Sequence, residues 1–381
     1  MPHASHANVT VTLADIVGRF GDDLRRQRRL PRQAHRVLNA IASCRTEALG
    51  GQRYDCSRCG HRHFVYHSCR NRHCPQCQSF TKAQWLAARQ AELLPVPYFH
   101  LVFTLPHELN PALMHHRRSV LNLLFTATAQ TLLQFGRQNL GGRVGFTMVL
   151  HTWDQQMNLH PHVHVLIPAG ALAGDGNRWI AAKRSFLFPV HALSKVFRGK
   201  FMHQAKAWID DPAVLDRLYT KPWVVYAKKP FAGPRKLLNY LGRYTHRVAI
   251  SNHRLGAIHG DRVVFDFRNR RRGDVVQTMN LDGVEFLRRF LLHVLPHRLQ
   301  RIRHYGLLAN RCKAALLARC RQLLSAPSPE VAPFTLESWL TQVMGRDIRC
   351  CPQCKARTLV ATAVPARSSR APPPSSTRHH R

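Results

Sequence analysis

The sequence predicts an α+β protein, and three observations support that prediction. A chain of 381 residues with 45% hydrophobic content can bury a sizeable core. Between residues 98 and 309, apolar stretches of strand length alternate with stretches that have helical periodicity. Some of these strands follow one another through short loops and others through helices, an order typical of an α+β or α/β sandwich.

The chain is expected to divide into residues 1–95, 96–310 and 311–381. The first part should hold two short helices within residues 10–49, a Cys- and His-rich segment over 53–78, and a helix over 79–94 that ends at two prolines. In the middle part we expect strands at 98–105, 144–151, 162–167, 223–227 and 263–267, and helices at 112–140, 192–209, 234–246 and 284–293. Residues 296–324 are predicted to be a basic helix, and the Pro-, Ser- and Arg-rich tail over 367–381 to be disordered.

The charge of the chain indicates a polyanionic partner. The formal net charge is +37, from 57 Lys and Arg against 20 Asp and Glu. Self-repulsion of this size destabilises a fold, so nucleic acid is the first expected partner. The apolar runs are too short to span a bilayer, the N-terminus lacks a secretory signal, and the eleven cysteines suit zinc in a reducing cytosol. We therefore expect a cytoplasmic protein with no membrane partner.

Two C-x-x-C motifs predict a structural zinc ion. Cys56 and Cys59 form the first motif, Cys74 and Cys77 the second, and fourteen residues separate them. Cys69 or His73 could replace one of these ligands. The favoured interpretation is that Cys69 packs as an apolar side chain and that His73 is solvated or hydrogen-bonded. Arginines surround the segment, among them Arg70 and Arg72, which makes it a candidate DNA-contacting module.

A third cysteine group, Cys350-Cys351-Pro-Gln-Cys354, has no matching pair downstream. It could borrow Cys312, Cys320 or a distant histidine, or it could be inert, and the sequence assigns it no role.

The run His160-Pro-His162-Val-His164 predicts a second kind of metal site. Alternate side chains of a strand share a face, so His162 and His164 should point one way, and Val163, Val165 and Ile167 the other. Two adjacent imidazoles can hold one divalent ion. His160 precedes the strand and is the expected third ligand, with Asp154, Gln155 and Gln156 as competitors. The alternative is a pair of surface histidines on an edge strand.

The segment after Gly233 places two tyrosines on one face of a predicted helix. Tyr240 and Tyr244 are four residues apart, and Lys236 lies one turn earlier on the same face. A tyrosine hydroxyl can attack a DNA phosphate and release a 3′-hydroxyl, while Lys236, Arg243 and Arg247 offset phosphate charge. By themselves, paired helical tyrosines are more often core or rim residues.

Together these motifs resemble the HUH (His-hydrophobic-His) nucleases, and specifically the two-tyrosine rolling-circle transposases of the ninety-one family of bacterial insertion sequences. The resemblance covers residues 53–309. It rests on four segments in a fixed order, namely residues 68–77, 159–164, 240–251 and 303–309.

The resemblance implies a fold, a reaction and partners. The fold would be an antiparallel sheet carrying the histidines, flanked by helices and preceded by a small helical and zinc-ribbon domain. The substrates would be single-stranded DNA at the element ends and target DNA, cut through a 5′-phosphotyrosine in the bacterial cytoplasm or nucleoid. It also implies magnesium or manganese at the histidines and no nucleotide cofactor, although imidazoles accept zinc too and leave the ion open. The oligomeric state is not implied.

Two other functions are compatible with the same residues. A plasmid replication initiator or relaxase would use the same chemistry. A non-enzymatic, zinc-dependent DNA-binding regulator would use the histidines and tyrosines only structurally.

Overall fold

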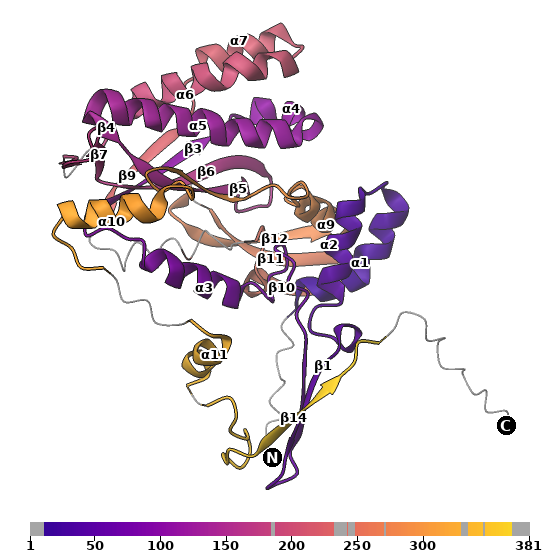
Figure 1. Ribbon diagram of the computed structural model, residues 1–381. Coiled ribbons are helices and arrows are strands. Elements are labelled where there is room, and N and C mark those ends of the chain that lie inside the picture. The colour runs from indigo at the N-terminus through magenta and orange to yellow at the C-terminus, as the bar shows by residue number, and fades with distance from the viewer. Residues whose placement is uncertain are drawn as a thin grey trace, which may run out of the picture.

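A five-stranded antiparallel sheet is the centre of the computed structural model (Figure 1). The strand order is β13-β5-β6-β3-β9, so β6, which carries the histidine run, lies in the middle. The strands are β3 (Tyr98–Thr104), β5 (Gly145–Trp153), β6 (Leu159–Pro168), β9 (Val225–Phe231) and β13 (Ile302–Gly306). The structure describes residues 11–183, 187–231, 242, 248–269, 272–328, 334–345 and 347–367, with the backbone alone for residues 229–231. The predicted α+β class is confirmed.

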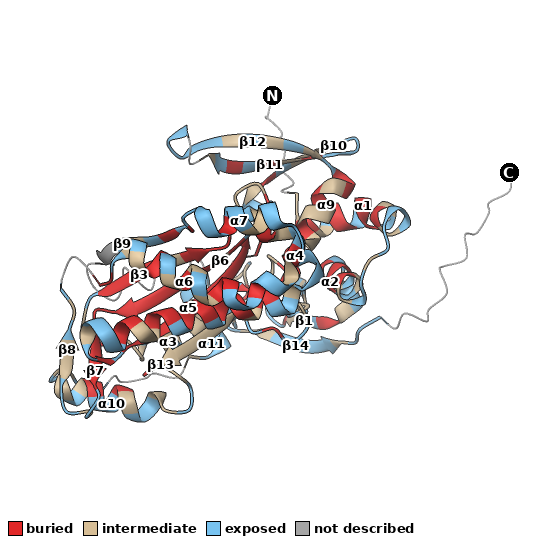
Figure 2. Cartoon of the chain, turned by 90° about the horizontal axis from the view of Figure 1, so that it is seen from above, coloured by how far each residue is buried: buried red, intermediate tan, exposed pale blue. Residues whose placement is uncertain are grey.

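Helices cover one face of this sheet and bury its apolar side chains. Val163, Val165 and Ile167 are completely buried in the main core, as strand alternation predicted. Figure 2 shows α5 and α6 lying across the buried strands. The helical elements that follow β3 and β8 are η2 (His107–Leu109), α4 (Asn110–His115), α5 (Arg117–Leu140), α6 (Val190–Ala205), η3 (Lys206–Trp208) and α7 (Pro212–Thr220). A small sheet beside them contains β4 (Gly142–Arg143), β7 (Gly170–Ala173) and β8 (Trp179–Ala181).

The N-terminal helices share a second core with a distant part of the chain. Phe20 of α1 and Leu38 of α2 lie in one buried cluster with Phe265 and Phe286. Thr12 begins α1 with a capping box to Asp15. The elements around this core are α1 (Leu13–Gln27), α2 (Arg32–Ala42), η4 (Asn252–Arg254), β10 (Leu255–His259), β11 (Arg262–Asn269), β12 (Val275–Asp282) and α9 (Gly283–Leu291). The division at residue 95 stays a prediction, and packing continues across it.

A slender three-stranded sheet extends away from the body of the molecule (Figure 1). Its order is β14-β1-β2, so the C-terminal strand pairs with the first strand of the chain. The remaining elements are η1 (Glu47–Leu49), β1 (Gly51–Cys56), β2 (Arg62–Tyr66), α3 (Ser79–Gln90), α10 (Lys313–Leu323), α11 (Leu336–Met344) and β14 (Leu359–Val364). Nothing in the sequence led us to expect β14 or its pairing.

The predicted helix over residues 296–324 is wrong in its first half. Residues 302–306 form strand β13, which pairs with β5 at the edge of the main sheet, and helix α10 begins only at Lys313. The arginines in this stretch favour a helix. Pairing with β5 and stacking of Tyr305 on Phe146, with ring centroids 5.6 Å apart, override that preference.

Two other expectations fall wholly or mostly outside the described residues. Of the predicted helix over 234–246, only Gly242 is described, and it is helical. The tail is described as far as Arg367. Within the described ranges, no helix has the length and apolarity needed to cross a bilayer.

Gly306, at the end of β13, lies close to the backbone of Val144 and leaves no room for a side chain. Its φ is +64°, and a Cβ there would lie 1.9 Å from the carbonyl oxygen of Val144. Gly306→Ala should lower the free energy of unfolding by about 2–5 kcal/mol, because a left-handed alanine costs about 1–2 kcal/mol and overpacking about 1–3 kcal/mol. Urea denaturation measures this loss.

Gly260→Ala is the matched control. Its φ is +58°, but no heavy atom lies within 4 Å of the added Cβ. This variant should lose only the conformational part, about 1–2 kcal/mol. Equal losses in both variants would contradict the close approach of β13 to Val144.

Candidate metal centre

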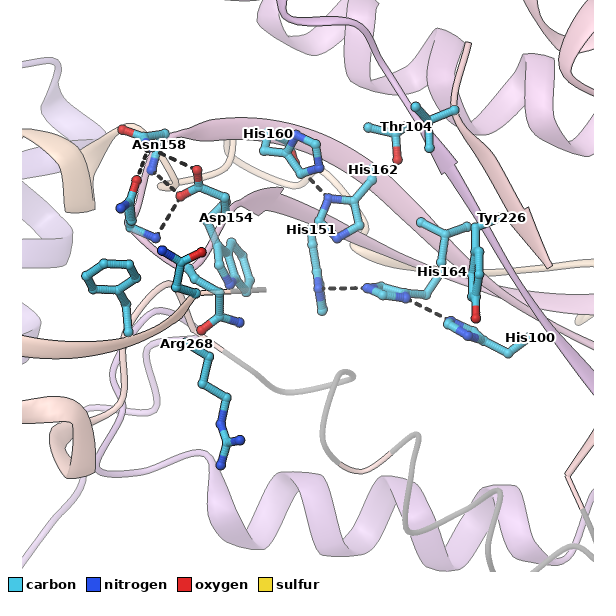
Figure 3. Close-up of a pocket in the computed structure, with 17 residues that line it drawn as sticks. His100, Thr104, His151, Asp154, Asn158, His160, His162, His164, Tyr226 and Arg268 are labelled. Carbon is cyan, nitrogen blue, oxygen red and sulfur yellow. Dashed lines mark hydrogen bonds between the residues drawn. The ribbon is translucent and has the colours of Figure 1, made fainter. Parts of the chain in front are cut away.

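The face of the main sheet opposite α5 and α6 carries a cleft lined by histidines (Figure 3). Its volume is about 840 Å³. Side chains reach it from four strands of the sheet, including His100 of β3, His151 of β5, His164 of β6 and Tyr226 of β9. Residues 267–269 of β11 and the loop after β5 close one side. The apolar face of the same strands is buried under helices, so the two faces have separate roles.

Three imidazoles converge in this cleft. The ligand nitrogens of His151, His162 and His164 all lie within 4.8 Å of one another. His151 Nδ1 is 3.1 Å from His164 Nε2. Two nitrogens bound to one ion at 2.0–2.1 Å are separated by about 3.0–3.4 Å, so this pair already has the spacing of two ligands of one ion. The donor set and the geometry both fit a divalent metal.

The group of three contains His151 and does not contain His160, which the sequence favoured as the third ligand. His151 is 97% buried and pairs with His162 across the β5–β6 ladder, whereas His160 is exposed and lies outside the group of three. The backbone carbonyl of His160 instead contacts His162 Nδ1 at 2.7 Å. Residues 144–151 and 162–167 were both predicted to be strands. Pairing them as a hairpin would have placed His151 opposite His162.

Behind the three imidazoles, His100 contacts the ring of His164. His100 Nε2 lies 2.9 Å from His164 Nδ1. Burial, together with the nearby Lys228, lowers the pKa of His100 to about 4, so this ring is neutral near pH 7. A metal ion bound by His164 Nε2 would leave the proton on His164 Nδ1, which would then donate to His100. Such outer contacts fix the orientation of a ligand ring.

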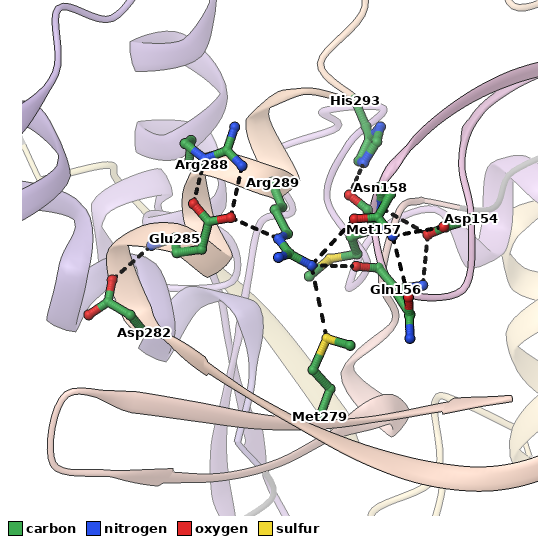
Figure 4. A network of polar contacts seen from close by, with 10 residues as sticks. All are labelled: Asp154, Gln156, Met157, Asn158, Met279, Asp282, Glu285, Arg288, Arg289 and His293. Atoms are coloured by element: carbon green, nitrogen blue, oxygen red, sulfur yellow. Dashed lines mark hydrogen bonds and ion pairs between the residues drawn. The ribbon is translucent and has the colours of Figure 1, made fainter. Parts of the chain in front are cut away.

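The loop between β5 and β6 is tied down from two sides (Figure 4). Asp154 closes the loop on itself, since its carboxylate accepts from the backbone N–H groups of Gln156 and Asn158, both at 2.8 Å. From α9, His293 Nε2 contacts the Met157 carbonyl at 3.0 Å and Arg289 reaches the Gln156 carbonyl at 3.4 Å. Asp154 is therefore a structural residue of the hairpin, and it lies outside the group of three imidazoles.

The four cysteines predicted to share one zinc ion belong to two different clusters. Cys74 and Cys77 lie with Cys44 and Cys69, while Cys56 and Cys59 lie elsewhere. The expectation of one Cys56-Cys59-Cys74-Cys77 site is therefore wrong: the two motifs lie in different parts of the fold, because β1 and β2 carry Cys56 and Cys59 away from the body.

In the first cluster, Cys69 is a member and His73 is not. Cys69 Sγ and Cys77 Sγ are 3.7 Å apart, close to the edge of about 3.8 Å of a tetrahedron with Zn–S bonds of 2.3 Å. Cys69 is therefore a candidate zinc ligand, and it also packs against the second core as expected. His73 is buried, and burial lowers its pKa to about 3, followed by the effect of the nearby Arg72. Cys44 follows α2 outside any C-x-x-C motif, so sequence spacing could not reveal it.

Most of the predicted tyrosine helix lies outside the described residues. Tyr240, Tyr244, Lys236, Arg243 and Arg247 are all in this part. Gly242, between the tyrosines, is described and buried. A Cβ there would lie 2.9 Å from Leu86 of α3. Leu86 in turn packs against Tyr98 and Leu166 of the main sheet. Because Leu166 points to the same face as His164, Gly242 lies on the histidine side of the sheet.

A basic groove runs between α3 and β13. It is lined by Trp85, Tyr305 and six cations, namely Arg70, Arg72, Arg89, Arg301, Arg303 and Lys313. Arg70 is exposed. Arg72 is half-buried, which lowers its pKa, and its guanidinium donates to the carbonyls of Leu299 at 2.6 Å and Pro296 at 3.0 Å. Arg72 thus anchors the zinc-binding segment to the segment before β13.

Comparisons with known proteins identify the class. Residues 145–315 match a family described as "Putative transposase", and residues 16–105 match the "Transposase zinc-binding domain". The chain is therefore a transposase with a zinc-binding domain. No solved structure matches it.

Two relatives narrow the class to a family. "Putative transposase y4qJ" of Sinorhizobium fredii is 44% identical over 377 residues, which cover 92% of this chain and 95% of the relative. "Transposase for insertion sequence element IS801" of Pseudomonas savastanoi pv. phaseolicola is 28% identical over 345 residues, or 86% and 83% of the two chains. The chain belongs to the ninety-one (IS91) family of insertion-sequence transposases.

The three-imidazole group can be tested by metal binding. Mn²⁺ prefers nitrogen and oxygen to thiolate ligands, so it reports on the histidines rather than on the cysteine clusters. His151→Ala should weaken Mn²⁺ binding by at least about 100-fold, since loss of a mere outer-shell partner costs about 10–100-fold. Calorimetric titration of the full chain measures the change.

His160→Ala is the control and should change Mn²⁺ affinity only a few-fold, because His160 lies outside the group. Loss of binding in His160→Ala with retention in His151→Ala would restore His160 as the third ligand.

Proposed function

We propose that this transposase cuts and rejoins single-stranded DNA through a 5′-phosphotyrosine formed on Tyr240 or Tyr244. The observation that carries the proposal is the group of His151, His162 and His164 in an open cleft on a transposase sheet. A divalent ion held there would polarise a phosphate oxygen and stabilise the charge of the transition state.

The reaction exchanges one phosphate ester for another. The tyrosine hydroxyl oxygen attacks phosphorus and the bond from phosphorus to the 3′ oxygen breaks; the phenol loses one proton and the leaving 3′ oxygen takes one up. The products are a phosphotyrosine at the 5′ end and a free 3′-hydroxyl. Because the number of phosphate esters is unchanged, no nucleotide cofactor is needed. A second tyrosine allows a further strand exchange before the first link is resolved.

The position of Gly242 supports the tyrosines as nucleophiles. In the helix predicted over residues 234–246, positions two residues before and after Gly242 point away from it, since each residue turns the helix by 100°. Gly242 packs against α3 on the histidine side of the sheet. A helix in this register would direct Tyr240 and Tyr244 away from α3, and Lys236 would follow on the tyrosine face.

Charge and the basic groove support DNA as the substrate. The net charge of +37 favours binding of phosphates, and the groove combines cations with Trp85 and Tyr305. Aromatic rings beside cations suit unpaired bases, which stack on them irrespective of sequence. We infer that the groove between α3 and β13 guides the strand toward the histidine cleft.

An adduct assay tests the chemistry. Full-length protein, Mn²⁺ and a single-stranded oligonucleotide from the element end should give a protein–DNA species that survives denaturation. Tyr240→Phe/Tyr244→Phe should reduce this adduct by at least about 1000-fold, because the nucleophile is absent. Denaturing electrophoresis with peptide mapping of the linked residue provides the measurement.

Tyr226, which is 53% exposed in the cleft, is the competing nucleophile among the described residues. Tyr226→Phe should leave the adduct in place. An adduct that persists in the double variant, or that disappears in Tyr226→Phe, would refute the assignment. Strong DNA binding without an adduct in the wild type would favour a non-enzymatic role.

A binding assay tests the groove. Arg70→Ala should weaken single-stranded DNA binding and reduce the slope of log K against log salt by about 1, as expected when one phosphate contact is lost. Arg137→Ala is the matched control, since Arg137 is an exposed arginine of α5 on the opposite side of the sheet. Equal effects of the two substitutions would show that only total charge matters.

A further inference from the structure

We propose that Cys56, Cys59, Cys351 and Cys354 hold a second structural zinc ion, which joins the β1–β2 hairpin to strand β14. Both family matches end at or before residue 315, so the C-terminal half of this site lies outside them. The inference does not depend on the phosphotyrosine chemistry.

The four sulfurs have the arrangement that zinc requires. Cys56 Sγ lies 3.6 Å from Cys354 Sγ, and Cys59 Sγ lies 3.6 Å from Cys351 Sγ. All four are within 4.8 Å of one another. A zinc tetrahedron with bonds of 2.3 Å has sulfur–sulfur edges of about 3.8 Å, whereas a disulfide bond is about 2.05 Å long. The spacing fits four ligands of one ion and does not fit two disulfides.

The two halves of the cluster have the same backbone turn. In the first, Cys56 N–H donates to the His61 carbonyl and Gly60 N–H to the Cys56 carbonyl, at 2.9 and 3.0 Å. In the second, Cys351 N–H donates to the Ala356 carbonyl and Lys355 N–H to the Cys351 carbonyl, at 2.8 and 3.0 Å. The offsets along the chain are identical.

The left-handed residue of each turn is also at the same offset. Gly60 has φ +71° and Lys355 has φ +60°, and each follows the second cysteine of its pair directly. Lysine adopts this conformation at a cost. Two C-x-x-C turns of the same geometry, facing each other, are how structural zinc sites present their thiolates.

The sheet brings these turns together. β14 pairs with β1 over six residues, from Gly51 opposite Val364 to Cys56 opposite Leu359. The second turn directly precedes β14, so the pairing of β14 with β1 places this turn beside the end of β1. Thr358 adds contacts there: its hydroxyl lies 3.1 Å from Cys56 Sγ, and its carbonyl accepts from Ser57 N–H at 3.1 Å.

Apolar packing contributes little to holding β14 against the β1–β2 hairpin. Val360 is 58% exposed, and Phe64 and Val65 of β2 are 49% and 45% exposed, so the three-stranded sheet buries little apolar surface. Two- or three-stranded sheets without a hydrophobic face are marginal in water. A metal bound by both turns would supply the stability that packing does not.

Zinc content tests the proposal in the purified full-length protein. Cys351→Ser/Cys354→Ser should contain one zinc ion per chain fewer than the wild type, measured by mass spectrometry of the metal. Cys350→Ser is the matched control and should retain the full content, since Cys350 is adjacent to the cluster and outside it. Equal zinc in the double variant and the wild type would overturn the proposal.

Alkylation of the native wild type gives a second test that does not depend on the folding of any variant. Cys59 is exposed and Cys350 is half-buried, so by exposure alone Cys59 should react first. Zinc ligation reverses that order: Cys350 should react with N-ethylmaleimide first, and Cys59 only after a chelator is added. Reaction of Cys59 before Cys350, or a disulfide bond between Cys56 and Cys354, would overturn the proposal.

Discussion

The pairing of β5 with β6 is the interaction on which the candidate site depends. Its register sets His151 opposite His162 and brings His164 within reach of both. A slip of β6 by one residue would turn His162 and His164 toward the apolar core and Val163 and Val165 toward the cleft. The loop between the two strands fixes the register. Asp154 closes this loop, and Arg289 and His293 of the α9 region form hydrogen bonds with its backbone carbonyls. Because α9 also shares a core with α1 and α2, the N-terminal helices support the candidate metal centre indirectly.

Much of the main sheet could be predicted because its pattern is local. Alternation in β6 predicts both the buried valines and the two histidines that face the cleft, and periodicity and two following prolines predict the helix over residues 79–94. The third imidazole was missed because it depends on which strand pairs with which. Strand β13 was missed because its arginines favour a helix until an edge of the sheet is available.

The cysteines show the limit of sequence spacing more clearly. C-x-x-C motifs reveal that two thiolates act together, and this held for Cys56 with Cys59, Cys74 with Cys77 and Cys351 with Cys354. Spacing does not reveal which pairs meet. Each pair found its partner through the tertiary fold: Cys74 and Cys77 with Cys44 after α2, and Cys56 and Cys59 with a turn almost 300 residues away. The nearest motif along the chain was the wrong partner in both cases.

The pairing of β1 with β14 also affects the protein while it is being synthesised and when its gene is truncated. Strand β1 is synthesised long before its partner β14. At a translation rate of about 5–20 residues per second, the roughly 300 intervening residues take about 15–60 s to synthesise. During that interval one edge of β1 exposes unpaired N–H and C=O groups. A gene copy that has lost its 3′ end leaves that edge open permanently. Decayed copies of such an element would therefore tend to encode proteins prone to associate through β1, even where the main sheet is intact.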